Sequence, residues 1–262
     1  MKSIPAIIGA ALLVTAGIVA PLLATEIPQG ARRSGYSFTA PETQAIQNDD
    51  TANPGMLSVL DGASLWKDKA GALSKACADC HHDAGVSMRG VAARYPAFDQ
   101  ALGRPVNLEQ RINLCRVRNQ QATPLAYESH ELLALTAFVA EQSRGVAIET
   151  GADPQLEPFI TKGRDLFMHR QGQLNLGCTN CHDDNWDKHL AGSAITQGQP
   201  TGYPLYRLEW QSLGSLERRL RSCMAGVRAQ PYDYGAPELV ELELYLMSRA
   251  RGMPIETPAV RP

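Results

Sequence analysis

Two copies of one short motif constrain this chain more than any other feature. The copies have the pattern Cys-x-x-Cys-His and comprise Cys77, Cys80 and His81, and Cys178, Cys181 and His182. This pattern is the attachment signature of c-type haem, in which two thiols bind the macrocycle covalently and the histidine binds the iron. A zinc pair or two short disulfides are the alternatives, but a zinc site needs four ligands and each motif supplies three. The sequence therefore predicts two covalently bound haem c groups, with His81 and His182 as axial iron ligands.

The first residues have the pattern of an export signal. Lys2 precedes an uncharged apolar stretch over residues 4–23, and the small residue Ala24 is a plausible cleavage point. An uncleaved anchor is the alternative, because about 20 apolar residues can cross a bilayer. Pro5 and Pro21 favour a signal peptide over residues 1–24. We therefore expect a periplasmic protein with no stable membrane span after cleavage, which agrees with haem attachment outside the cytoplasm.

The composition suits two haem domains and gives no sign of nucleic-acid binding. The formal net charge is −2, so the chain lacks the basic excess that binding to phosphates requires. The length beyond the signal suits two domains of about 100 residues each. Residues 25–54 contain Pro28, Pro41 and Pro54 without an apolar period, and they predict an extended N-terminal segment.

The two halves of the chain repeat one another. Residues 62–66 match residues 163–167 at a displacement of 101, and residues 108–112 match residues 216–220 at a displacement of 108. The displacement changes between the haem motif and the later segment. The second copy therefore has a longer loop there, which we place around residues 192–202.

The coarse pattern within each copy is helical. Leu239, Leu242 and Leu246 recur at helical spacing, and residues 132–139 form an apolar helix that we expect to be buried on most sides. The predicted fold is all-α. It has two tandem cytochrome c-like domains related by internal duplication, over residues 55–150 and 151–262, after the signal peptide and a loop-rich extension.

The remaining cysteines, Cys115 and Cys223, occupy matching positions ahead of the last helix of each copy. Many cytochromes c place a methionine iron ligand in this region. We predict that Cys115 and Cys223 bind the two irons as thiolates. Two alternatives stay open, namely a Cys115–Cys223 disulfide and ligation by Met88 and Met224.

Arginines flank both cysteines, and their charge lowers a thiol pKa and favours the ligating thiolate. Around the first cysteine they are Arg111, Arg116 and Arg118, and around the second they are Arg218, Arg219, Arg221 and Arg228. A solvated helix face is the simpler explanation of such a run. A thiolate ligand should also lower the reduction potential of the haem, which favours a specialised centre over a general electron shuttle.

The two haem motifs, the paired cysteines and the R-x-x-x-C-M segment over residues 219–224 resemble the SoxA family of the periplasmic thiosulfate-oxidising system. The resemblance extends over the chain beyond the signal. It implies an L-cysteine S-thiosulfotransferase that forms a heterodimer with a SoxX-type cytochrome subunit. Such an enzyme oxidatively joins thiosulfate to a cysteine of the SoxYZ carrier protein and passes electrons to a cytochrome c acceptor.

The resemblance also implies roles for single residues. Cys223 corresponds to the active-site cysteine, a ligand of the second haem that carries a persulfide, and Arg219 corresponds to the arginine that contacts the substrate. Cys115 corresponds to the ligand of the first haem. Arg218, Arg221 and Arg228 could join Arg219 in binding the sulfonate of thiosulfate.

Two other functions are compatible with dihaem motifs. The first is an electron-transfer cytochrome c without bond-forming activity. The second is a dihaem peroxidase, which turnover of hydrogen peroxide would identify.

Overall fold

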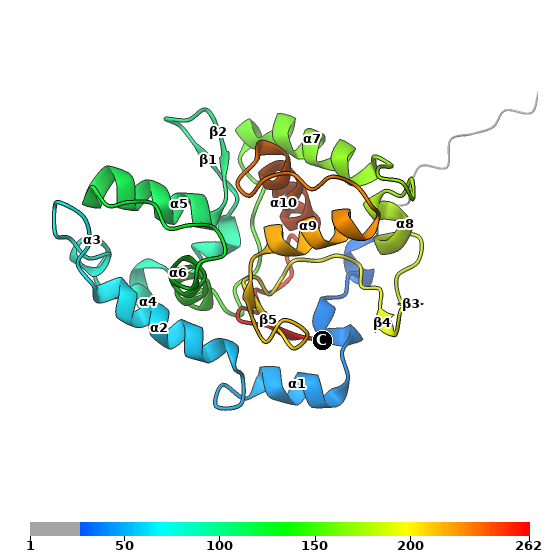
Figure 1. Ribbon diagram of the computed structural model, residues 1–262, viewed down its shortest axis with the longest axis horizontal. Coiled ribbons are helices and arrows are strands. Elements are labelled where there is room, and N and C mark those ends of the chain that lie inside the picture. The colour runs from blue at the N-terminus through cyan, green and yellow to red at the C-terminus, as the bar shows by residue number, and fades with distance from the viewer. Residues whose placement is uncertain (1–26) are drawn as a thin grey trace, which may run out of the picture.

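The computed structural model describes residues 27–262 (Figure 1). The predicted signal peptide lies outside these residues. Among the described helices, none combines the length and the apolar character needed to cross a membrane.

Two helical units follow one another along the chain and lie side by side (Figure 1). The first unit contains α2 (Gly55–Lys67), α3 (Ala78–His81), α4 (Ala84–Ser87), α5 (Leu108–Cys115) and α6 (His130–Glu141), with short turns η3 (Ala92–Arg94) and η4 (Arg116–Gln120). The second unit contains η5 (Pro154–Leu156), α7 (Glu157–Met168), α8 (Cys178–His182), α9 (Leu216–Gly226) and α10 (Pro237–Arg249). The predicted repeat therefore appears as a repeat of helices.

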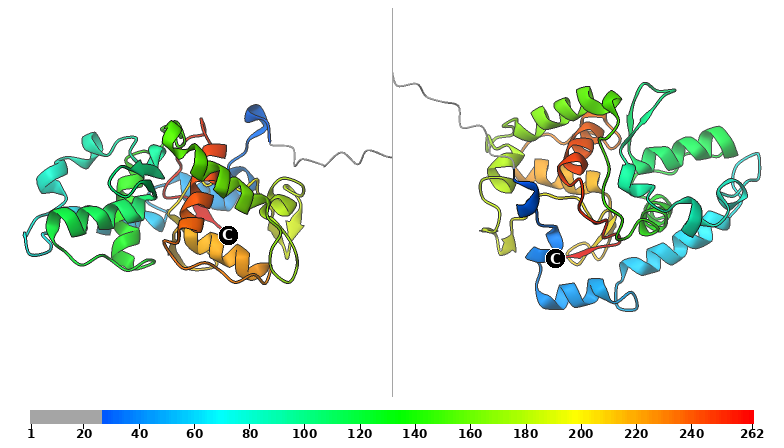
Figure 2. Two further views of the ribbon diagram at one scale, coloured as in Figure 1. Left: turned by 90° about the horizontal axis from the view of Figure 1, so that it is seen from above. Right: turned by 180° about the vertical axis from the view of Figure 1, so that it is seen from behind.

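Each unit is built on a pair of crossing helices, α2 with α6 and α7 with α10 (Figure 2). A glycine lies at each crossing. A Cβ atom on Gly62 would overlap the carbonyl oxygen of Ala134, and one on Gly163 would overlap that of Glu241. The helices approach closely because these positions carry no side chain. The apolar helix predicted over residues 132–139 is confirmed, since most of α6 is buried.

Short strands accompany the helices, so the all-α prediction is incomplete. Within residues 27–262 they form three small sheets. The antiparallel pair β1 (Ala97–Asp99) and β2 (Arg104–Val106) recurs in the second unit as β5 (Leu205–Arg207) and β6 (Ser212–Gly214). The second pair gains a parallel partner in β7 (Val260–Arg261), and β3 (His189–Leu190) pairs with β4 (Ser193–Ala194).

The N-terminal segment is more ordered than its proline content indicated. It contains the turns η1 (Gln29–Ala31) and η2 (Gly35–Phe38) and the helix α1 (Pro41–Asn48). It packs against the second unit, where the Arg33 backbone donates to Gln197 Oε1 at 2.6 Å and Ser34 donates to Glu256 Oε1 at 2.6 Å. The segment therefore connects the start of the chain to the second unit.

A buried acidic cluster joins the two units. Asn107 is fully buried, and its Nδ2 donates to Glu217 Oε1 at 3.0 Å and to Glu243 Oε2 at 3.2 Å. Burial is the main reason that the pKa of Glu217 rises to about 7 and that of nearby Glu109 to about 8. The interface between the units therefore holds carboxyl groups that bind protons near neutral pH.

Candidate haem sites

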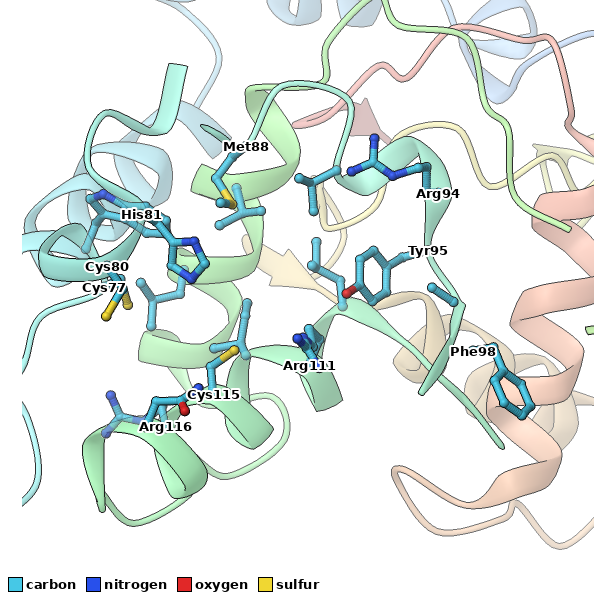
Figure 3. A pocket seen from close by; sticks show the side chains of 18 of the residues that line it. Cys77, Cys80, His81, Met88, Arg94, Tyr95, Phe98, Arg111, Cys115 and Arg116 are labelled. Carbon is cyan, nitrogen blue, oxygen red and sulfur yellow. The ribbon is translucent and has the colours of Figure 1, made fainter. Parts of the chain in front are cut away.

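The first haem motif opens onto a cavity of about 530 Å³ (Figure 3). Cys77 and Cys80 lie at its edge on and beside α3, His81 points into it, and Cys115 approaches from the end of α5. Apolar side chains make up much of the remaining wall, including those of Trp66, Val91, Leu108, Ile112, Leu135 and Val139. The volume lies in the range of pockets that enclose cofactors, and the apolar wall suits a macrocycle.

Positive charge beside the first site is compensated. Asp99 has a side chain that is only 5% exposed, and it pairs with Arg111 at 3.2 Å and with Arg118 at 3.5 Å. Burial alone would raise the pKa of Asp99, but backbone N–H donors and these two arginines hold it below its ordinary value. The Asp99 carboxylate is therefore ionised and neutralises part of the arginine cluster.

The second site orients its histidine through the longer loop. His182 Nδ1 lies 2.7 Å from the carbonyl oxygen of Thr196, and because a carbonyl can only accept, Nδ1 carries the proton. The other ring nitrogen then keeps its lone pair, which is the arrangement of metal-ligating histidines. Gly198 lies against the same ring, where a Cβ would approach the imidazole to 3.2 Å.

The loop predicted around residues 192–202 therefore serves the second site. It is tied to the N-terminal segment, because Gln197 is fully buried and its Nε2 donates to the Ala31 carbonyl at 3.1 Å. Thr201 at its end donates to Glu256 Oε2 at 2.9 Å. These bonds hold Thr196 and Gly198 against His182.

Cys223 faces His182 across the second site. Burial by itself raises the pKa of the Cys223 thiol, but a hydrogen bond with His182 and the charge of Arg219 outweigh it. Arg207 contributes in the same direction, and the net effect lowers the pKa of Cys223. Burial also raises the pKa of Tyr203 to about 12, although Arg219 opposes this rise.

The four arginines that flank Cys223 in the sequence differ in where their side chains point. Among the four flanking arginines, Arg219 is the one that acts electrostatically on the thiol. Arg218 lies 3.8 Å from Glu128 Oε2, Arg221 stacks on Tyr234 at 4.4 Å, and Arg228 lies 3.5 Å from Gln173 Oε1. Those three side chains contact other residues, although Arg221 Nη1 is buried without a hydrogen-bond partner within residues 27–262. Arg219 is therefore the flanking arginine whose charge favours the Cys223 thiolate, and the wider cluster stays a prediction.

Sequence reasoning missed three residues near the cysteines. Tyr95 and Arg111 line the first cavity with Cys115. Tyr203 and Arg219 lie near Cys223 and are their counterparts 108 residues later in the sequence. Asp99 and Arg207 are separated by the same 108 residues. Following that displacement beyond the motifs would have identified Tyr95, Tyr203 and Arg207.

The positions of the side chains bear on the two alternatives for Cys115 and Cys223, namely a disulfide between them and methionine ligation of the irons. None of the six cysteines, all of which lie within residues 27–262, forms a disulfide. Cys115 lies near Cys77, whereas Cys223 lies near Cys178. Met224 is 3% exposed and packs in an apolar core cluster with Phe167 and Leu220, among others. Met88 lines the first cavity together with Cys115, so the first unit presents both candidate ligands.

The residues present fit c-type haem. Each site combines a pair of thiols, a histidine and an apolar surround, and the first has a cavity of suitable volume. At the second, Arg249 is 4% exposed and stacks 4.5 Å from the Phe167 ring, while its Nη1 atom is buried without a hydrogen-bond partner. Its charge acts on Cys178, so the unpaired donor suits an anionic group of a ligand attached there. For the zinc alternative, residues 27–262 contain no group of three or more His, Cys, Asp or Glu side chains placed to hold a metal ion.

Comparisons with known proteins agree with this arrangement. The family model described as SoxA/TsdA, cytochrome c domain, matches residues 61–148 and 162–255. The L-cysteine S-thiosulfotransferase subunit SoxA of Pseudaminobacter salicylatoxidans is 39% identical over 87% of this chain and 80% of the relative, and that of Rhodovulum sulfidophilum is 37% identical over the same shares. The crystal structure of SoxXA from P. pantotrophus contains a chain that superposes with a TM-score of 0.85 at 30% identity, covering 88% of this chain and 87% of the other. The chain thus belongs to the SoxA/TsdA cytochrome c family.

Proposed function

We propose that this chain is the dihaem subunit of an L-cysteine S-thiosulfotransferase, which conjugates thiosulfate to a cysteine of a SoxYZ-type carrier. The observation that carries the proposal is the pairing of Cys223 with His182 and Arg219, in a chain whose relatives are named for this activity. The partner is a SoxX-type cytochrome, as in the SoxXA structure from P. pantotrophus. The electrons leave to a cytochrome c acceptor.

We assign the haem ligands by unit. Cys77 and Cys80 would hold the first haem covalently, with His81 and Cys115 as axial ligands. Cys178 and Cys181 would hold the second, with His182 and Cys223 as axial ligands. The first domain extends over residues 55–150 and the second over residues 151–262, after a signal peptide at residues 1–24 that directs the chain to the periplasm and a segment over residues 25–54.

The reaction joins two sulfur atoms and releases two electrons. The terminal sulfur of thiosulfate bonds to the carrier cysteine sulfur, the thiol proton passes to solvent, and two electrons leave to the acceptor. When bound, c-type haem supplies the one-electron acceptance that this oxidation needs. We assign Cys223, as a persulfide, to be the active-site sulfur of the chain beside which this S–S bond forms.

The chain's own residues bind and orient the reactants. The Arg219 guanidinium suits the sulfonate end of thiosulfate, because its planar donors match two oxygens of an oxyanion. This places the terminal sulfur toward Cys223. The Thr196 carbonyl fixes the His182 ring, and a fixed ligand keeps the site in one geometry.

The decisive experiment uses the complete complex with its SoxX-type partner. We expect thiosulfate and a reduced SoxYZ-type carrier to yield carrier bearing one added S–SO₃ group, with two equivalents of cytochrome c reduced per conjugate. Mass spectrometry of the carrier measures the first quantity and absorbance the second. Reduction of cytochrome c without carrier modification would instead identify an electron-transfer protein.

A further inference from the structure

The two units differ in charge at one pair of matching positions, which lie near Cys115 in the first unit and near Cys223 in the second. Asp99 ends β1 and Arg207 ends β5, at the same register of two equivalent hairpins. The Asp99 position pairs with Arg104 across its hairpin, and the Arg207 position pairs with Ser212. The second unit therefore exchanges a carboxylate for a guanidinium where the rest of the arrangement is retained.

In the first unit this position is occupied by a buried anion. The Asp99 carboxylate pairs with Arg111 at 3.2 Å, and Arg111 is the counterpart of Arg219. A second arginine, Arg118, pairs with the same oxygen at 3.5 Å. The Asp99 carboxylate thus already pairs with the Arg111 guanidinium, which an incoming oxyanion would need as its donor.

In the described part of the second unit Arg219, the counterpart of Arg111, has no carboxylate paired with it. Within residues 27–262 the Arg219 side chain forms no ion pair or hydrogen bond. Arg207 Nε donates to Glu209 Oε2 at 2.9 Å, and the Arg207 guanidinium lies 5.3 Å from the Trp210 ring, but neither Nη atom of Arg207 donates a hydrogen bond to a described residue. The two Nη atoms of Arg207 therefore retain their donors. Glu209 has a 66% exposed side chain, so solvent weakens its hold on Arg207, whose own side chain is 14% exposed.

Arg207 and Arg219 occupy the positions of Asp99 and Arg111, which lie 3.2 Å apart in the first unit. The two second-unit arginines are therefore neighbours on the same side of their site. Both charges reach Cys223, and both reach Tyr203. Arg261 also reaches Tyr203, but its Nη2 is paired with Glu256 at 2.8 Å. Within residues 27–262, Arg207 and Arg219 therefore combine unused Nη donors with a charge that acts on Cys223.

We propose that Arg207 is a second substrate-binding arginine, which holds the sulfonate of thiosulfate together with Arg219. The proposal rests on the proposed function and adds to it. Two guanidiniums suit a dianion, because each can donate two hydrogen bonds to oxyanion oxygens. The Asp99-to-Arg207 exchange would also confine this binding to the second unit, although the first unit has a similar Tyr–Arg–Cys set.

The two members of the Arg207–Glu209 pair give opposite predictions. Arg207→Gln should raise the KM for thiosulfate at least about tenfold with a small change in kcat, since a charge-assisted bond to the substrate is lost. Glu209→Gln should lower KM about two- to threefold, because it releases the competing carboxylate. A purely structural ion pair would make both variants change stability in the same direction and leave KM unmoved. Arg164→Gln is the control, since it removes one exposed positive charge from α7 in the same unit.

A binding measurement separates recognition from turnover. Sulfate, an unreactive dianion, should bind the oxidised wild-type complex in calorimetry and bind Arg207→Gln at least about fivefold more weakly. If Arg207→Gln does not yield folded holo-complex, Glu209→Gln alone decides the question. An Arg207→Gln KM within twofold of wild type, or a Glu209→Gln KM that does not fall, would overturn the role of Arg207. A wild-type complex that never modifies the carrier would overturn the proposed function instead.

Discussion

At the residue scale, the proposed iron ligand Cys223 decides what the second site can do. A thiolate there would supply both a strong donor to iron and a sulfur that can bond to another sulfur. Cys223→Met should remove the second property while preserving ligation through a thioether. We expect the reduction potential of the second haem to rise and sulfur transfer to be lost, as measured by redox titration and carrier mass spectrometry. Cys115→Met is the matched variant, and it should raise the potential of the first haem. Full sulfur transfer by Cys223→Met would contradict the assignment.

Arg219 gives a second test at the same scale. Lysine keeps the positive charge but has no planar pair of donors for an oxyanion. Arg219→Lys should therefore lower kcat/KM for thiosulfate by roughly 10- to 100-fold, corresponding to about 1.5–3 kcal/mol for a hydrogen bond to a charged group. The measurement is steady-state cytochrome c reduction, with Arg164→Lys as the control. Retained wild-type turnover would show that charge alone suffices.

At the element scale, both units depend on glycine where two helices cross. Gly163→Ala places a methyl group against the Glu241 carbonyl, so overpacking should destabilise the protein by about 1–3 kcal/mol. Gly226→Ala in α9 is the control, because its Cβ would have no neighbour within 4 Å. That variant should be neutral or gain up to about 1 kcal/mol from helix propensity. Urea unfolding of the holo-protein measures both. An equal effect of the two substitutions would show that the crossing tolerates a side chain.

Local sequence patterns predicted much of this level of structure. The motifs, the helical repeat and the longer second loop were all visible, because each depends on neighbours along the chain. The residues that contact the site's histidine and cysteine from distant parts of the chain were not visible in the sequence. Thr196 contacts His182 through the path of a loop. The charge of Arg207 acts on Cys223 from a hairpin whose Ser212 accepts a hydrogen bond from Arg218 of α9. Such contacts depend on tertiary packing, and the repeat displacement alone could have indicated Arg207.

At the scale of the whole molecule, the duplication brings matching acids together. Glu109 on α5 and Glu217 on α9 occupy the same repeat position. The two carboxyl groups lie near one another where the units meet, and Glu243 lies beside them. Neither periodicity nor motif predicted this cluster, because its members become neighbours only when the units pack. Its burial makes the interface between the units sensitive to proton concentration.

That sensitivity predicts a stability profile with a definite sign. Burial raises the pKa of Glu109 from 4.5 to about 8, so between these values the folded state binds more protons than the unfolded state. The free energy of unfolding should therefore fall as pH rises from about 5 to 8, by up to about 1.4 kcal/mol per pH unit for one such carboxyl. Glu109→Gln should flatten this slope and stabilise the protein at pH 8 relative to wild type. Urea unfolding at pH 5, 6.5 and 8 measures the slope, with the exposed Glu157→Gln as control. A wild-type stability that rises over this range would mean that the carboxyl groups are ionised in the folded protein.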